Sequence, residues 1–289
     1  MFLFLQNKIG NFRLAQFALI ITTLIWGSTF IIVKDALSQS PPFYFGFFRF
    51  FIGAIVMIFL LDRSTIFKKN ELYPAIICGL FLFSGYSFQN FGLVETTPTL
   101  SAFITSVSVL MVPVILAIFQ IEKIKIKIWV AVFVACFGIH LLTPNGLIDL
   151  GIGDQLTFGC ALSFAIHIIF QGRYMKKIKS INNFFFIQSM VVAILSLFSG
   201  FLFEDFSAIQ FDFSLLMAFL ITGILATTVA LLMMIWAQTV LSAPQTAIII
   251  ILEPVFAALF SVGFAYEILS PIQYVGCMVV LIAVFIGEK

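Results

Sequence analysis

Apolar residues form ten long stretches along this chain, separated by short polar gaps. An α-helix needs about 20 apolar residues to cross a hydrocarbon core of about 30 Å. The stretches are long and continuous, unlike the alternating strands of a membrane β-barrel. The pattern therefore predicts an all-α integral membrane protein. Its ten expected transmembrane helices cover residues 17–37, 43–61, 73–92, 98–119, 128–143, 155–174, 183–203, 214–237, 245–265 and 271–287.

Lysine and arginine gather in alternate gaps between these stretches. Thirteen of the 15 basic residues lie in the two terminal segments, at the end of the sixth stretch, or in the gaps after the second, fourth and sixth stretches. Short basic loops remain in the cytoplasm. We therefore expect both termini inside and an even number of crossings. These residues are Lys8, Arg13, Arg63, Lys68, Lys69, Lys123, Lys125, Lys127, Arg173, Lys176, Lys177, Lys179 and Lys289.

Composition narrows the classes of function. The chain is 62% hydrophobic and 10% charged, which is not the composition of a soluble protein. The short gaps leave no room for a soluble catalytic or nucleic-acid-binding domain. His140 and His167 are far apart with no metal-ligand spacing, and no nucleotide-binding or hydrolase motif occurs. We therefore expect no cofactor, no metal and no nucleic-acid partner.

The two halves of the chain repeat each other weakly, at an offset of 145 residues. Ser101 begins a segment that corresponds to the one beginning at Thr246, and Glu122 corresponds to Glu267. An odd number of crossings separates these segments, so they run in opposite directions. The pattern predicts two five-helix repeats, 1–145 and 146–289, inverted relative to each other. Such duplication places a binding site near the middle of the membrane, between the halves.

Several short motifs then resemble the drug/metabolite transporter superfamily of the EamA type, across the whole chain. Each motif is weak alone, but their order, together with ten spans and the repeat, is typical of that fold. The resemblance implies transport of amino acids or related metabolites, with export as the direction. The sequence departs from this family directly after Glu267, where the family often has a basic residue and this chain has Ile268. The motifs are Trp26–Phe30 with Lys34, Phe48–Phe50, Gly85-Tyr86, Gln89–Leu93, Ala102–Thr105, Val112-Pro113, Leu252–Leu259 and Gly276.

Charged side chains inside the predicted spans are candidates for function, because a charge in hydrocarbon is costly unless it meets a partner or a wet cavity. Glu253 lies near mid-depth before Pro254, which removes a backbone donor. It either binds a cationic group or a proton, or makes a structural hydrogen bond. Arg49 either pairs with Glu95 or binds a substrate carboxylate. Lys34 lies near the outer end of its span and is expected to extend to the interface.

Polar residues recur at helical spacing on three spans and form three predicted faces. These faces either line a common cavity or let the helices pack closely. The large aromatic rings of Trp26 and Tyr86 favour the first alternative, because they are suited to form the wall of a binding cavity. We expect the spans numbered one, three, four, six, eight and nine to surround a central path. Together with Glu253, the predicted cavity residues are Trp26, Thr29, Tyr86, Gln89, Asn90, Thr105 and Ser108.

These features favour a secondary transporter that moves a small organic metabolite by alternating access. The alternatives are an intramembrane enzyme acting on lipid, which needs a nucleophile or metal cluster that the sequence does not display, and a receptor or structural component without flux. We expect a protein of the inner, cytoplasmic membrane of a bacterium. Its partners are the lipid bilayer and a small-molecule substrate, and it functions as a monomer, with a dimer as the alternative.

The charge pattern makes a topology prediction. A cysteine introduced within residues 144–154 should react with an impermeant thiol reagent added outside the cell, and one within residues 176–180 should not. The basic segments place the second region in the cytoplasm. Labelling of intact cells is the measurement, and the reverse result would contradict the orientation.

Overall fold

The computed structural model describes residues 8–62, 64, 68–142, 151–264 and 268–288, and the regular secondary structure of this part of the chain is entirely helical. Eight helical segments are long and apolar enough to cross a membrane, and two shorter apolar helices accompany them. The elements are α1 (Lys8–Leu37), α2 (Pro42–Met57), η1 (Ile58–Leu60), α3 (Lys69–Glu95), α4 (Pro98–Ile118), α5 (Ile126–Leu142), α6 (Ile152–Met175), α7 (Ile181–Phe203), η2 (Phe206–Ala208), α8 (Phe213–Leu220), η3 (Ile221–Val229), α9 (Ala230–Ala237), α10 (Ala243–Ile250), α11 (Glu253–Phe264) and α12 (Pro271–Glu288).

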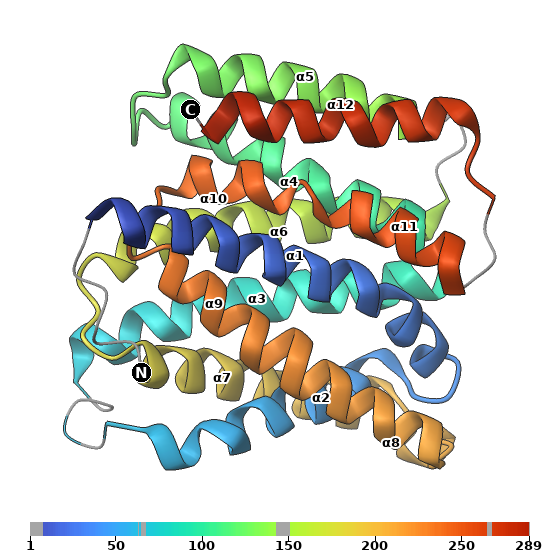
Figure 1. The fold of residues 1–289 in the computed structure, drawn as a ribbon. Coiled ribbons are helices and arrows are strands. Elements are labelled where there is room, and N and C mark those ends of the chain that lie inside the picture. The colour runs from blue at the N-terminus through green and yellow to red at the C-terminus, as the bar shows by residue number, and fades with distance from the viewer. Residues whose placement is uncertain (1–7, 63, 65–67, 143–150, 265–267, 289) are drawn as a thin grey trace.

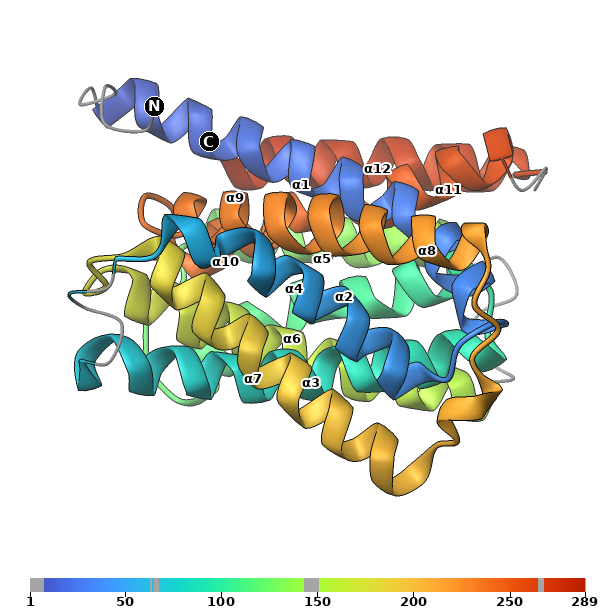
Figure 2. The ribbon, with the colours of Figure 1, turned by 90° about the horizontal axis from the view of Figure 1, so that it is seen from below.

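The helices run roughly along one direction and form a bundle (Figure 1). The helix α1 begins and α12 ends at the same end of the bundle, on the left of Figures 1 and 2. The start of α3 at Lys69, the start of α5 at Ile126 and the end of α6 at Met175, each near a cluster of basic residues in the sequence, lie at that end, which we call the basic end. Within the bundle α3 packs along α6, α2 along α7, and α5 along α12. The α5–α12 pair forms an outer layer.

The boundaries of α4 and α10 follow from capping residues. The Thr97 hydroxyl accepts a hydrogen bond from the Leu100 amide, and Pro98 is the first residue of α4. Before α10, Ser242 and Gln245 form a reciprocal capping box, and Pro244 lies in the first turn. Serine or threonine before proline is a common helix start, because the side chain satisfies an amide that has no intrahelical partner. The two helices begin at opposite ends of the bundle (Figure 1).

The ninth apolar segment is broken into two helices. The helix α10 ends at Ile250, two residues form a turn, and α11 begins at Glu253. Pro254 in the first turn of α11 has no amide to donate to a preceding carbonyl, and this accounts for the break. The carboxylate of Glu253 therefore lies at the N-terminus of a 12-residue helix, where the helix dipole favours negative charge.

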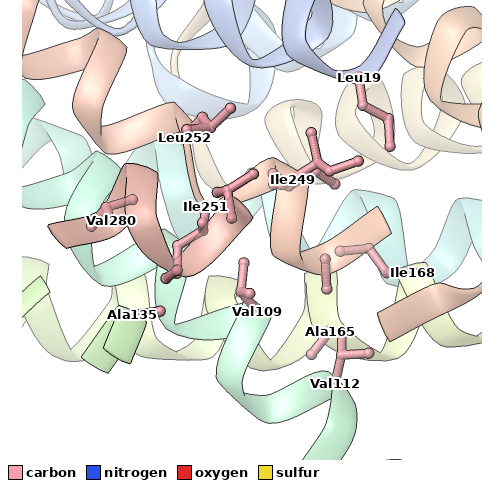
Figure 3. Close-up of a cluster of buried hydrophobic side chains, with 14 of the residues drawn as sticks. Leu19, Val109, Val112, Ala135, Ala165, Ile168, Ile249, Ile251, Leu252 and Val280 are labelled. Carbon is pink, nitrogen blue, oxygen red and sulfur yellow. The ribbon is translucent and has the colours of Figure 1, made fainter. Parts of the chain in front are cut away.

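An apolar cluster surrounds this break. Figure 3 shows side chains of α1, α4, α6, α10 and α12 converging there, among them Val109, Val112, Ile168 and Ile249, all less than 4% exposed. By contrast, many phenylalanines are exposed on the outside of the bundle, such as Phe133 of α5 and Phe201 of α7. Exposed apolar rings on the outside of a membrane bundle are suited to contact lipid.

Glycine allows the closest approach of α1 to α11. A Cβ atom at Gly27 would lie 2.7 Å from the Phe256 Cβ and 2.8 Å from the Glu253 carbonyl oxygen. Real Cβ atoms do not come so close to backbone atoms. Small residues drive such contacts in membranes, where helix packing rather than the hydrophobic effect holds helices together.

This contact leads to a stability prediction. Gly27→Ala should force α1 and α11 apart and lower the melting temperature of the detergent-solubilised protein, at a cost of about 1–3 kcal/mol. Gly263→Ala is the matched control, because a Cβ at Gly263 in α11 meets nothing within 4 Å. The control should melt at the wild-type temperature or higher. Equal melting temperatures for the two variants would show that the α1–α11 contact is not tight.

Candidate functional site

A narrow cavity lies at mid-depth of the bundle. The space inside it that the centres of water-sized spheres can reach is about 50 Å³, which is room for a few waters. Eight helices contribute to its wall, and most of the wall is apolar. The lining residues are Trp26, Thr29, Phe30 and Val33 of α1, Arg49 of α2, Leu82, Tyr86 and Gln89 of α3, Thr105 and Ser108 of α4, Phe164, His167 and Ile168 of α6, Leu231 and Met234 of α9, Ile250 of α10 and Glu253 of α11.

Arg49 brings a positive charge into this cavity and is only 4% exposed. Its Nε donates a 2.8 Å hydrogen bond to the Thr227 hydroxyl, and one terminal nitrogen donates a 3.3 Å bond to the Tyr86 hydroxyl. The guanidinium carbon also lies 4.4 Å from the centre of the Tyr86 ring, which is a cation–π distance. These two bonds use two of the five N–H groups of the guanidinium, so the other three can donate hydrogen bonds to a ligand.

Thr227 lies in a π-helical segment, η3, which separates α8 from α9. A π turn shifts the register of the helix, and such turns are frequent at functional sites. Here the segment also presents the Ala226 carbonyl to α1, where the Trp26 indole nitrogen donates a 2.8 Å hydrogen bond to it. Near the end of the segment, Thr22 of α1 donates a 3.2 Å bond to the Ala230 carbonyl. The η3 segment therefore positions both Arg49 and Trp26.

Glu253 contributes the negative charge of the cavity. Its side chain is 6% exposed, and its carboxylate interacts electrostatically with Arg49. No hydrogen bond or ion pair joins this carboxylate to another described residue. A carboxylate at a helix N-terminus, next to a guanidinium and free of direct partners, has unused acceptors in the cavity. The site thus holds one positive and one negative group in a small, mostly apolar space.

All the predicted cavity residues except Asn90 line this cavity. Asn90 is buried elsewhere, with its amide nitrogen donating a 3.2 Å hydrogen bond to the Pro42 carbonyl at the start of α2. It therefore joins α3 to α2 and lies outside the lining of the cavity. The spacing of Asn90 from Tyr86 on one helix cannot distinguish the two sides of a broad polar face.

The predicted charge partners are arranged differently from the expectation. Arg49 contacts Thr227 and Tyr86, whereas Glu95 is exposed at the end of α3, and the two side chains do not pair in the described structure. Lys34 does lie at the end of its span. Its ammonium donates 2.7 and 2.8 Å bonds to the carbonyls of Leu93 and Val94. It thereby satisfies carbonyls at the C-terminal end of α3, as cations commonly do.

Sequence reasoning missed the contributions of α2 and of His167. Arg49 brings α2 to the cavity, and α2 was not among the expected wall helices. The buried charge of Arg49 was a usable signal, because such a residue faces the interior of a bundle. His167 is 2% exposed and lines the wall, although its position in α6 gave no motif. The apolar wall residues resemble any other buried residue of the chain.

A family model, the EamA-like transporter family, matches residues 13–143 and again residues 151–286. The chain therefore belongs to the EamA-like transporter family, an integral membrane class consistent with the drug/metabolite transporter superfamily. Its two matches cover nearly the whole sequence.

Individual relatives point to the same class. The chain is 35% identical to an "Uncharacterized transporter" of Archaeoglobus fulgidus over 274 residues, which cover 94% of this chain and 85% of the relative. It is 24% identical to "Uncharacterized transporter YoaV" of Bacillus subtilis, over 93% of this chain and 94% of the relative. A solved structure titled "Crystal structure of protein" has a TM-score of 0.78 at 17% identity, covering 94% of this chain and 95% of that one. The last likeness concerns the fold alone.

The Arg49–Thr227 contact gives a further prediction. Thr227→Val keeps the shape but leaves the buried Nε without its acceptor, and should cost about 1–3 kcal/mol of stability. In an Arg49→Met background the same substitution should cost much less, because no donor is then left unpaired. Melting temperatures of the four proteins form a double-mutant cycle. A coupling energy near zero would contradict the contact.

Proposed function

We propose that this protein is a secondary transporter that moves a small zwitterionic metabolite, an amino acid or a related compound, out of the cell by alternating access. The observation that supports it is the presence of Arg49 and Glu253 in one cavity at mid-depth. Membership of the EamA-like family and the names of its relatives support transport rather than catalysis.

The two charges suggest how such a substrate would bind. A guanidinium fork matches the geometry of a carboxylate, and the carboxylate of Glu253 matches an ammonium group. The remaining wall includes Leu82, Phe164 and Met234, which suit a short apolar side chain. A zwitterion also keeps the cavity near electrical neutrality, which favours its passage through hydrocarbon.

The topology proposed from the charge pattern is consistent with the arrangement of the helices. We propose ten crossings, two inverted halves, and the basic end in the cytoplasm of a bacterial cell. Support comes from the double match of one family model and from the opposite directions of α4 and the α10–α11 pair. Support for one copy as the functional unit comes from the cavity wall, to which one chain contributes eight helices.

Alternating access requires each side of the cavity to open in turn. The apolar cluster includes Ile168, which lines the cavity, and Leu116 and Ile169, which line a wide recess toward the basic end. The recess has a volume of about 640 Å³ and is lined by residues that include Glu122, Arg173 and Ser242. Separation of that cluster would join the recess to the cavity and admit the substrate from the cytoplasmic side.

A metabolite comparison would test this function most directly. Cells that overexpress the protein and cells that lack it should differ in the extracellular level of at least one amino acid. That compound should then be taken up by liposomes containing the purified protein. A receptor or structural component predicts no flux for any compound, and that result would overturn the proposal.

The role of Glu253 can be separated from its structural effect. Glu253→Gln keeps the shape but removes the charge and the titration, so it should fold normally and lose most pH-dependent flux in liposomes. Removing one charged hydrogen bond to an ammonium group costs about 1.5–3 kcal/mol, or about one to two orders of magnitude in affinity. Flux at two pH values, with a melting curve, is the measurement.

Glu95→Gln is the control for that experiment, because Glu95 is exposed at the end of α3. The control should transport like the wild type. If Glu253→Gln also retains normal pH-dependent flux, Glu253 has no role in binding a cation or a proton.

A further inference from the structure

The ring of Phe164 forms part of the α6 side of the cavity wall, together with His167 and Ile168. Its centre lies 5.2 Å from the centre of the Tyr86 ring, in an edge-to-face arrangement. The Tyr86 ring in turn lies 4.4 Å from the guanidinium carbon of Arg49. Phe164 is therefore one ring away from the group that is proposed to bind the substrate carboxylate.

Gly85 of α3 leaves the space in which this ring lies. A Cβ atom at position 85 would overlap with the Cδ1 and Cε1 atoms of Phe164 and would lie 3.2 Å from its Cζ. Gly85 is inside a regular α-helix, so its backbone conformation does not require glycine. The ring of Phe164 thus occupies the place that a side chain at position 85 would take.

A second glycine of α3 has a different role. A Cβ atom at Gly92 would lie 2.7 Å from the Gly153 carbonyl oxygen, which belongs to the backbone of α6. Gly92 therefore allows the two helix backbones to approach each other. At Gly85, by contrast, the three nearest atoms all belong to the Phe164 ring. The absence of a side chain at Gly85 accommodates this ring rather than a neighbouring backbone.

The helices α3 and α6 are joined directly beside the ring. The hydroxyl oxygens of Ser84 and Ser163, the residues before Gly85 and Phe164, lie 3.0 Å apart. Ser163 donates a 2.9 Å hydrogen bond to the Gly159 carbonyl, so Ser84 is the donor between the two hydroxyls. Because the backbones are held here, a side chain at position 85 would displace the ring. Phe164 is only partly buried and lines the cavity, so the ring has room on that side.

The cavity leaves little space for a substrate side chain next to this ring. It has room for a few waters in total. A zwitterion bound between Arg49 and Glu253 would fill most of that room with its carboxylate and ammonium groups. A ring displaced toward the cavity would take up what remains, whereas loss of the ring would open a space of about its own size.

We propose that Phe164, held against α3 by Gly85, limits the substrate to zwitterions with small side chains, such as glycine and alanine. Phe164 contacts the substrate side chain. Gly85 is a positioning residue that acts through the ring. This inference rests on the proposed function and narrows its substrate class.

Uptake of alanine, leucine and phenylalanine by liposomes containing the purified full-length protein tests this size limit. The wild type should accumulate alanine in preference to the two larger compounds. Phe164→Ala should raise uptake of leucine and phenylalanine relative to alanine by about tenfold or more, because even one methylene group changes discrimination by a hydrophobic pocket by about 10–200-fold.

Phe170→Ala is the matched control on the same helix. The Phe170 ring stacks on Phe81, with ring centres 5.6 Å apart, and it is not part of the cavity lining. This variant should keep the wild-type order of the three compounds. If Phe164→Ala keeps that order as well, the ring does not set the size limit and the inference is overturned.

Gly85→Ala tests the positioning role. It should lower uptake of alanine at least several-fold, because the displaced ring narrows the cavity. In the Phe164→Ala background the same substitution should leave the uptake of all three compounds unchanged, since no ring is left to displace. An equal loss in both backgrounds would show that Gly85 acts independently of Phe164. If Gly85→Ala does not fold, as judged by its melting curve, the double variant still makes this comparison with Phe164→Ala.

The results also separate this inference from the function on which it rests. A wild-type protein that accumulates leucine and phenylalanine as readily as alanine would overturn the size limit and leave the proposed function in place. A wild-type protein that accumulates no zwitterion of any size would contradict the proposed function, and the size limit with it.

Discussion

A guanidinium in the middle of an apolar bundle must find partners, and much of the central architecture meets this requirement. Arg49 is held by a hydroxyl from η3 and by the hydroxyl and ring of Tyr86. A straight α-helix in place of η3 would present a different register toward α2. The opposite charge stands at the start of α11, where a proline-induced break exposes a helix N-terminus. Two departures from regular helix thus border the same cavity.

Hydropathy alone predicted the helices well, because a membrane demands long apolar segments whose backbone bonds are satisfied internally. The described helices follow the ten predicted stretches, although α1 begins earlier, at Lys8. The break before Glu253 was foreseeable from Pro254. The π-helical segment was not, since no proline or glycine pair marks Ile221–Val229 as irregular, and its register depends on contacts with α1 and α2.

The cavity was predictable as far as helical spacing allows. Trp26, Tyr86 and Thr105 line the cavity, because the polar side of a membrane helix generally faces inward. Asn90 lies outside its lining and Glu95 does not meet Arg49, for a common reason. Spacing gives the relative angle of side chains on one helix, but it does not give the rotation of that helix against its neighbours. Glu267, part of the repeat argument, lies outside the described residues.

The turn between α10 and α11 has a mechanical consequence. Helix α10 packs on α1, α4 and α12, whereas α11 packs on α1 and α4 and comes closest to α1 at Gly27. A bend at residues 251–252 can therefore move α10 along the surface of α1 while the tight contact between α1 and α11 at Gly27 is kept. Helix α10 starts at Ala243, which lines the recess at the basic end. Small rotations at residues 251–252 would change the width of the recess while the carboxylate of Glu253 stayed in place.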